Sequence, residues 1–158
     1  MNIRRATEKD IPKVLDLLQQ VLKVHSDLRP DLFIEGTTKY TAEELAEMFR
    51  DDTRPVYVGV DVNDEVLGYA FCVVNEPVPS NNLHPHRSIY IDDICVDAEA
   101  RGQHVATQLF EYVKEEARRL GCYHITLNVW AGNDAAQHFY EVMGMTPKKT
   151  EMEYILED

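Results

Sequence analysis

An apolar strand, a short turn and an amphipathic helix follow one another between residues 89 and 120. The strand covers residues 89–96, and Gly102 lies in the turn after it. The helix is predicted from apolar residues that recur at steps of three and four, namely Ala106, Leu109, Phe110, Val113, Ala117 and Leu120. Because a second apolar run follows at 124–129, the pattern predicts two parallel strands joined by a right-handed helical crossover.

The other elements complete an α/β fold in one domain, residues 1–158, with a mixed, twisted central sheet flanked by helices on both faces. Thr7 with Asp10, and Thr41 with Glu44, have the spacing of capping boxes and predict two early helices. Gly121 is predicted to end the helix after the turn. Strands are expected at 2–6, 56–60, 66–74, 89–96, 124–129 and 152–156, and a short last helix at 134–143.

Composition bounds the class of protein and of partner. With 158 residues, 44% hydrophobic and 28% charged, the chain is long enough to bury a full core and is typical of a globular protein. The net charge of −12 argues against a nucleic-acid partner, since phosphate backbones require a basic face. Two roles of this charge are open. It attracts a cationic ligand such as a basic amine or peptide, or it only keeps the protein soluble.

The sequence also indicates a compartment. No apolar run approaches the ~20 residues of a membrane span, and no apolar segment of a signal peptide follows the N-terminus. We therefore expect no membrane association. Cys72, Cys95 and Cys122 are odd in number and form no Cys-x-x-Cys pair, so reduced thiols and a cytoplasmic location are expected.

The turn before the central helix is a candidate anion site. A helix that begins in a loop presents unpaired backbone N–H groups and the positive end of its dipole. Such an end suits a phosphate or pyrophosphate group. Most turns of this kind bind nothing, so the pattern by itself leaves both readings open.

Two blocks of sequence resemble the GNAT superfamily, the GCN5-related N-acetyltransferases. The family signature Arg/Gln-x-x-Gly-x-Gly/Ala corresponds to Arg101-Gly102-Gln103-His104-Val105-Ala106. The second block has an asparagine followed by a helix that ends Phe-Tyr-x-x-x-Gly, which corresponds to Asn133, Phe139, Tyr140 and Gly144. The separation of the two blocks and the order of elements also match the family, so a GNAT-type domain is expected.

The resemblance implies acetyl-CoA as co-substrate and a set of residues that hold it. The pantetheine arm would pair with the backbone of β-strand residues Ile94, Cys95 and Val96 like an added strand. The pyrophosphate would lie at the helix start. Asn133 would contact the cofactor from a facing turn. The residues expected at the helix start are Arg101, Gly102, Gln103, His104, Val105, Ala106 and Thr107.

His104 departs from the family pattern, which has glycine at this position. Three consequences are open: the imidazole points outward and weakens binding slightly, it helps to hold phosphate when protonated, or its Cβ prevents cofactor binding.

The resemblance also implies direct transfer of an acetyl group to a primary amine in a ternary complex. A lysine-like amine has a pKa of about 10.4, so a base must help to remove its proton at neutral pH. Asp92 is the preferred base or amine-binding carboxylate, the alternative being a structural acceptor. Strand alternation puts Asp93 on the opposite face, where a structural role is expected. Tyr140 would protonate the departing CoA thiolate.

Several further features limit this hypothesis. The acceptor is a small amine, a polyamine or a peptide amine. A second hypothesis is a non-catalytic CoA-binding sensor or scaffold, indicated by His104.

Cys95 is expected to pack rather than react, and the loop residues His84 and His86 are not expected to bind metal. Dimers are common in the family, and the last predicted strand could pair between subunits of a homodimer.

Overall fold

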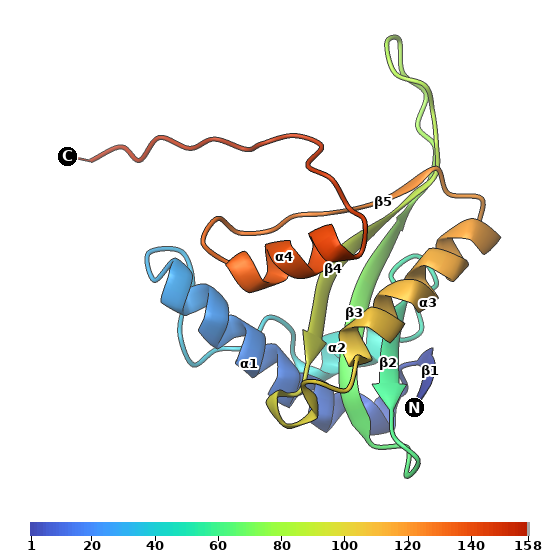
Figure 1. The fold of residues 1–158 in the computed structure, drawn as a ribbon, viewed down its shortest axis with the longest axis vertical. Helices are drawn as coiled ribbons and strands as arrows, with labels where there is room; N and C mark the ends of the chain where they lie inside the picture. The colour runs from blue at the N-terminus through green and yellow to red at the C-terminus, as the bar shows by residue number, and fades with distance from the viewer. Residues whose placement is uncertain (158) are drawn as a thin grey trace. The chain divides into compact units, whose positions relative to one another are not determined.

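The computed structural model describes residues 1–157 and contains two compact units (Figure 1). The first unit comprises Met1–Asn128 and holds a five-stranded sheet. The second begins at Val129 and holds the last helix, α4 (Asp134–Val142). The expectation that both units form one domain stays a prediction.

The sheet of the first unit is mixed, as the sequence predicts. Its strands lie in chain order, and neighbours are antiparallel except for the last pair, which is parallel. The hairpin and the parallel strand–helix–strand unit are therefore confirmed. The strands are β1 (Asn2–Arg5), β2 (Val56–Val60), β3 (Val66–Asn75), β4 (Ser88–Val96) and β5 (His124–Leu127).

Helices cover both faces of this sheet. Alternate residues of β2 point to opposite faces, so Val58 packs in a core with α1 (Ile11–Leu28) and α2 (Ala42–Met48). The neighbouring Tyr57 instead makes an edge-on ring contact at 5.1 Å with Tyr112 of α3 (Val105–Arg119). Two short 3-10 helices, η1 (Glu8–Asp10) and η2 (Ala98–Ala100), precede α1 and α3.

The predicted helix boundaries have the expected physical causes. At α2, the Glu44 amide donates to the Thr41 hydroxyl at 3.1 Å and the Thr41 amide donates to the Glu44 carboxylate at 3.0 Å, which completes a capping box. At the end of α3, Gly121 has φ +72°, and its amide and that of Cys122 donate to carbonyls of the last turn. None of the described helices is long and apolar enough to cross a membrane.

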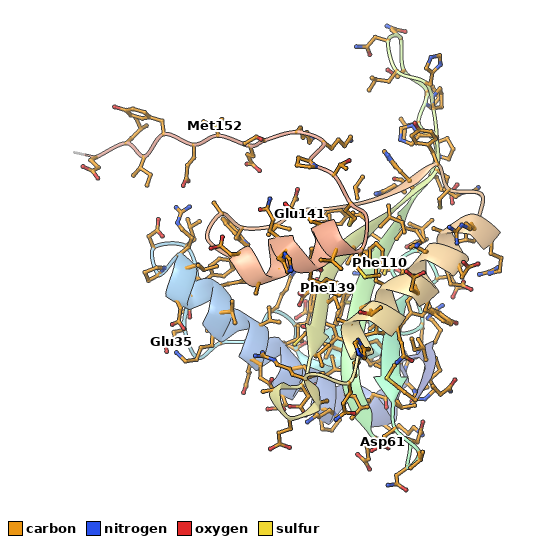
Figure 2. All side chains as sticks on the ribbon, in the orientation of Figure 1. Glu35, Asp61, Phe110, Phe139, Glu141 and Met152 are labelled. Atoms are coloured by element: carbon orange, nitrogen blue, oxygen red, sulfur yellow. The ribbon has the colours of Figure 1, made fainter. Side chains whose placement is uncertain are left out.

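The predicted strand at 152–156 is wrong: no regular secondary structure is present from Met145 to Glu157. Figure 2 shows Met152 on this extended segment. A strand requires a neighbour for its backbone hydrogen bonds, and no ladder within residues 1–157 includes this segment. The alternating pattern of apolar side chains indicates a segment that could form a strand, but it does not show whether a neighbouring strand is present to pair with it.

Candidate active site

A β-bulge in β4 places two carboxylates at the centre of the candidate site. Phe71 pairs with Asp93 and Cys72 pairs with Ile91, so Asp92 is the extra residue on β4. Strict alternation therefore does not hold across the Asp92–Asp93 pair, contrary to the sequence expectation. The charge of one ammonium group, that of Lys39, acts on both carboxylates.

Asp92 forms an ion pair with Lys39. The Lys39 Nζ donates a hydrogen bond of 2.7 Å to Asp92 Oδ2. Burial disfavours the charged form of Lys39, but the hydrogen bond and charge of Asp92 outweigh it and raise the pKa of Lys39. The Asp92 side chain is 27% exposed, so solvent reaches part of it beside the ion pair.

Asp93 has a different environment. The hydroxyl of Tyr69, a fully buried residue of β3, donates to Asp93 Oδ2 at 2.6 Å. Burial raises the pKa of Asp93 to about 6, although the Tyr69 hydrogen bond opposes the rise. The site thus combines a partly exposed carboxylate in an ion pair with a buried carboxylate whose pKa is raised to about 6.

The end of β4 has an unpaired backbone edge. The last β4–β5 pair is Ile91 with Leu127, whereas β4 continues to Val96. Among residues 1–157, no strand pairs with residues 92–96 on the β5 side. The backbone of Ile94, Cys95 and Val96 is therefore available on that side to an extended ligand.

Glycine permits the close approach of β3 to this end of β4. A Cβ atom on Gly68 would lie 2.7 Å from the Cys95 carbonyl oxygen, which is too close for any side chain. It would also lie 3.1 Å from Val105, the first residue of α3. Because Gly68 has no side chain, β3 can pack closely against both the end of β4 and the start of α3.

The turn between β4 and α3 is anchored to α1. Asp97 forms an ion pair with Lys13, and its side chain accepts from the Glu99 amide at 3.3 Å. The Ala98 amide donates to the side chain of Gln20 at 3.2 Å. These contacts fix the path of the chain as it leaves β4, so the start of α3 has a defined place relative to the strand.

The exposed residues Arg101–His104 lead into α3 through two left-handed backbone positions. Gly102 has φ +83° and His104 has φ +60° with ψ +28°. A non-glycine residue in this region is strained by roughly 1–2 kcal/mol. The family's preference for glycine at this position has a direct backbone explanation, and His104 adopts the conformation despite its Cβ.

The start of α3 has the features of an anion site. His104 is the N-cap residue, and its side chain makes no capping hydrogen bond. The amides of Val105, Ala106 and Thr107 precede the first hydrogen bond of the helix, which the Gln108 amide donates to the His104 carbonyl. The helix dipole adds a partial positive charge, and the first turn contains no acidic residue.

Cys95 has the environment of a packing residue. It is buried, and its thiol donates to the Leu17 carbonyl of α1 at 3.6 Å. Burial raises the pKa of Cys95 to about 12, so the thiolate needed for nucleophilic attack is scarce at neutral pH.

Asn133 and Tyr140 lie in the second unit, and each has a defined local role there. The Asn133 side chain accepts from the Ala136 amide at 3.3 Å and caps α4. Tyr140 lies in the last turn of α4, with its ring centroid 5.1 Å from that of Phe139. Its carbonyl accepts from Met145 at 3.0 Å, while Gly144, with φ +97°, donates to Glu141. This pattern ends the helix at Val142, within one turn of Tyr140.

Of the two loop histidines, His86 contacts His124 of β5. His86 Nδ1 lies 3.0 Å from the His84 carbonyl oxygen, and its Nε2 lies 3.2 Å from Nε2 of His124. Over the part of the chain that the structure describes, no three His, Cys, Asp or Glu side chains form a group able to hold a metal ion.

Lys39 and Tyr69 belong to the site but were not singled out from the sequence. Lys39 lies in an irregular segment, 53 residues before its partner Asp92, and Tyr69 reads as an ordinary strand residue. Nothing near either residue in the sequence indicates these partners. The pairing arises because the chain segment after α1 and strand β3 both lie against β4.

Comparison with known proteins identifies the family of the chain. Residues 21–145 match the acetyltransferase (GNAT) family. A Bos taurus thialysine N-epsilon-acetyltransferase is 36% identical over 152 residues, which cover 90% of this chain and 82% of that protein. An Arabidopsis thaliana glucosamine 6-phosphate N-acetyltransferase is 30% identical over 63 residues, 40% of each chain, so the match spans less than half of that enzyme.

A solved structure extends the similarity to the whole fold. A point mutant of the BH1408 protein from Bacillus halodurans superposes with a TM-score of 0.94 at 27% identity, covering 99% of this chain and 100% of that one. The range that matches the family, residues 21–145, runs from α1 to the residue after Gly144. The chain belongs to the GNAT family of acetyltransferases.

Proposed function

We propose that this protein transfers an acetyl group from acetyl-CoA directly to a primary amine in a ternary complex. The observation that carries the proposal is the uncapped start of α3 immediately after the unpaired end of β4. The start of α3 offers backbone N–H donors to a pyrophosphate, and the end of β4 offers an unpaired backbone edge to an extended pantetheine arm. Membership of an acetyltransferase family supports the same ligand.

In this proposal, residues 101–107 hold the pyrophosphate of acetyl-CoA through backbone amides, with the Arg101 side chain available as a cationic partner. The backbone of Ile94, Cys95 and Val96 holds the pantetheine arm. An amide on this edge would polarise the thioester carbonyl as negative charge develops on its oxygen. Asn133 would add a contact from the second unit.

Asp92 would bind the acceptor as an ammonium group and accept its proton, directly or through water. The neutral amine then attacks the thioester carbonyl carbon and the C–N bond forms. The nitrogen loses its excess proton to solvent as the C–S bond breaks. Tyr140 would donate its phenolic proton to the departing thiolate, which leaves as the free thiol. No covalent acyl-enzyme is required, which agrees with the raised pKa of Cys95.

The acceptor class is a primary amine carried by a small molecule, a polyamine or a peptide. The names of the cattle and plant relatives both specify acetylation of a nitrogen, on thialysine in one and on glucosamine 6-phosphate in the other. We further propose a single catalytic domain that spans both units, because the family match crosses their boundary. A cytoplasmic location and a homodimer stay predictions.

A titration of the purified protein with acetyl-CoA tests the proposal first. Calorimetry should give micromolar binding, and desulfo-CoA should bind comparably because the pyrophosphate and pantetheine contacts are kept. Release of free thiol with a panel of primary amines should then identify turnover. Absence of binding at high micromolar acetyl-CoA would contradict the proposed function.

A non-catalytic CoA-binding sensor or scaffold is the second candidate. The observation that favours it is the strained His104 at a position where the family has glycine. Retained CoA binding without thiol release for any amine in the panel would support this candidate over the transferase.

Replacing His104 with glycine is expected to tighten acetyl-CoA binding about threefold and to stabilise the fold by roughly 0.5–1 kcal/mol. Glycine adopts the left-handed conformation without strain and removes the Cβ next to the proposed pyrophosphate site, although it gains entropy when unfolded. Calorimetry and denaturant unfolding measure the two effects.

His104→Ala is the matched control, because it retains the Cβ and the backbone strain but lacks the imidazole. It should bind acetyl-CoA about as the wild type does. Weaker binding by both variants would instead show that the imidazole holds the phosphate.

A further inference from the structure

The Lys39 ammonium occupies a small site with a carboxylate on one side and an aromatic ring on the other. Its Nζ donates to Asp92 Oδ2 at 2.7 Å and lies 5.5 Å from the centroid of the Tyr40 ring. A carboxylate and an aromatic face are the two groups that proteins use to recognise an alkylammonium ion. The cation in the site belongs to the chain itself.

The walls of this site are rigid. The Tyr40 ring stacks on Phe71 with centroids 5.7 Å apart, and Phe71 contacts the Tyr69 ring edge-on at 4.8 Å. Phe71 and Tyr69 are buried in β3, and Asp92 is held on β4 by the bulge. Contacts that do not involve Lys39 therefore hold the Tyr40 ring and the backbone of Asp92.

Lys39 itself is less firmly held. Its side chain is 52% exposed, and it lies in the segment of residues 29–41 between α1 and α2, which has no regular helix or strand. An ion pair with this exposure contributes little to stability, because solvent screens it. Displacement of the Lys39 ammonium therefore costs little, and a competing cation of similar shape can replace it.

We propose that the site between Asp92 and Tyr40 binds the primary alkylammonium group of the acceptor, and that Lys39 is a tethered competitor that must leave first. The proposal rests on the proposed function only in naming the ligand as the acceptor. Its ligand class is a primary amine at the end of a flexible alkyl chain, since that is the group that now fills the site. The net charge of −12 favours such a cation over an anionic acceptor.

Removing the charge of Lys39 should strengthen the binding of an alkylammonium ion. n-Butylamine reproduces the lysine side chain and is the probe. Lys39→Met keeps most of the alkyl stem and abolishes the competing cation. Calorimetry should give butylamine binding about fivefold tighter than wild type, because the fraction of protein with an open site rises. The titration is made with and without CoA.

Two control variants isolate the cause. Lys23→Met removes an ammonium that pairs with Asp27 on the surface of α1, and it should leave butylamine binding unchanged. Lys39→Arg retains a cation and should bind butylamine about as the wild type does. Equal or weaker binding by Lys39→Met, or no binding of butylamine to either protein, would overturn the proposal.

Kinetics separate this proposal from the proposed transferase. Lys39→Met should lower the KM for butylamine by the same factor as the binding constant, with kcat unchanged. Tighter binding without thiol release from any amine would establish the alkylammonium site and reject the transferase function. Turnover with an unchanged KM would retain the transferase and reject Lys39 as a competitor.

Discussion

Replacing Tyr140 with phenylalanine is expected to lower kcat about hundredfold, with little change in the KM for acetyl-CoA. A phenol can give its proton to the thiolate as that group departs. Phenylalanine cannot donate, but it keeps the ring next to Phe139 and the backbone hydrogen bond that ends α4. Initial rates of thiol release measure the effect, and thermal unfolding should show an unchanged fold.

Tyr154→Phe is the matched control for this experiment. Tyr154 is 87% exposed in the segment after α4, so loss of its hydroxyl should leave the rate unaltered. Wild-type turnover by Tyr140→Phe would show that another group, or water, protonates the thiolate. A larger KM for acetyl-CoA with unchanged kcat would instead assign Tyr140 to binding.

Asp92→Asn is expected to lower kcat/KM for the amine about hundredfold at neutral pH. Asparagine is close to isosteric but can neither attract the ammonium by charge nor accept its proton. Because an alkylamine has a pKa of about 10.4, only a small neutral fraction reaches the variant from solution. We therefore expect kcat/KM of the variant to rise about tenfold per pH unit up to the pKa of the amine.

Asp93→Asn distinguishes the roles of the two carboxylates. The pKa of Asp93 is raised to about 6 by burial, so its charge is lost as the pH falls through that value. If Asp93 supports the reaction only through its negative charge, the wild-type rate should fall below about pH 6. This acidic limb of the pH–rate profile should be absent in Asp93→Asn. A hundredfold loss in Asp93→Asn with near-normal Asp92→Asn would reverse the assignment.

Local patterns in the sequence predicted most of the fold. The helix beginning with the Thr41–Glu44 capping box, the helix ended by Gly121 and the hairpin of β2 and β3 all have causes within a few residues. Capping, glycine conformation and apolar periodicity act over one or two turns, so they can be read from one stretch of chain. The parallel pairing of β4 with β5 followed from the helix between them.

The predictions failed where the outcome depends on a partner distant in the chain. Met152–Leu156 has the alternation of a strand but belongs to no ladder among residues 1–157. The expectation of opposite faces for Asp92 and Asp93 rests on strict alternation, and the register of β3 against β4 interrupts that alternation with a bulge. Neither the absence of a neighbour nor a shift of register is encoded in the segment itself.

For the candidate site, the sequence by itself determined the chemical groups: two adjacent carboxylates, a glycine-bearing turn and the start of a helix after that turn. Only the tertiary structure decided their environments. It gave Asp92 an ion pair with Lys39 and gave Asp93 a buried tyrosine. The physical reason is that hydrogen-bond partners and exclusion of water set the properties of a carboxylate, and both come from segments far away in the chain.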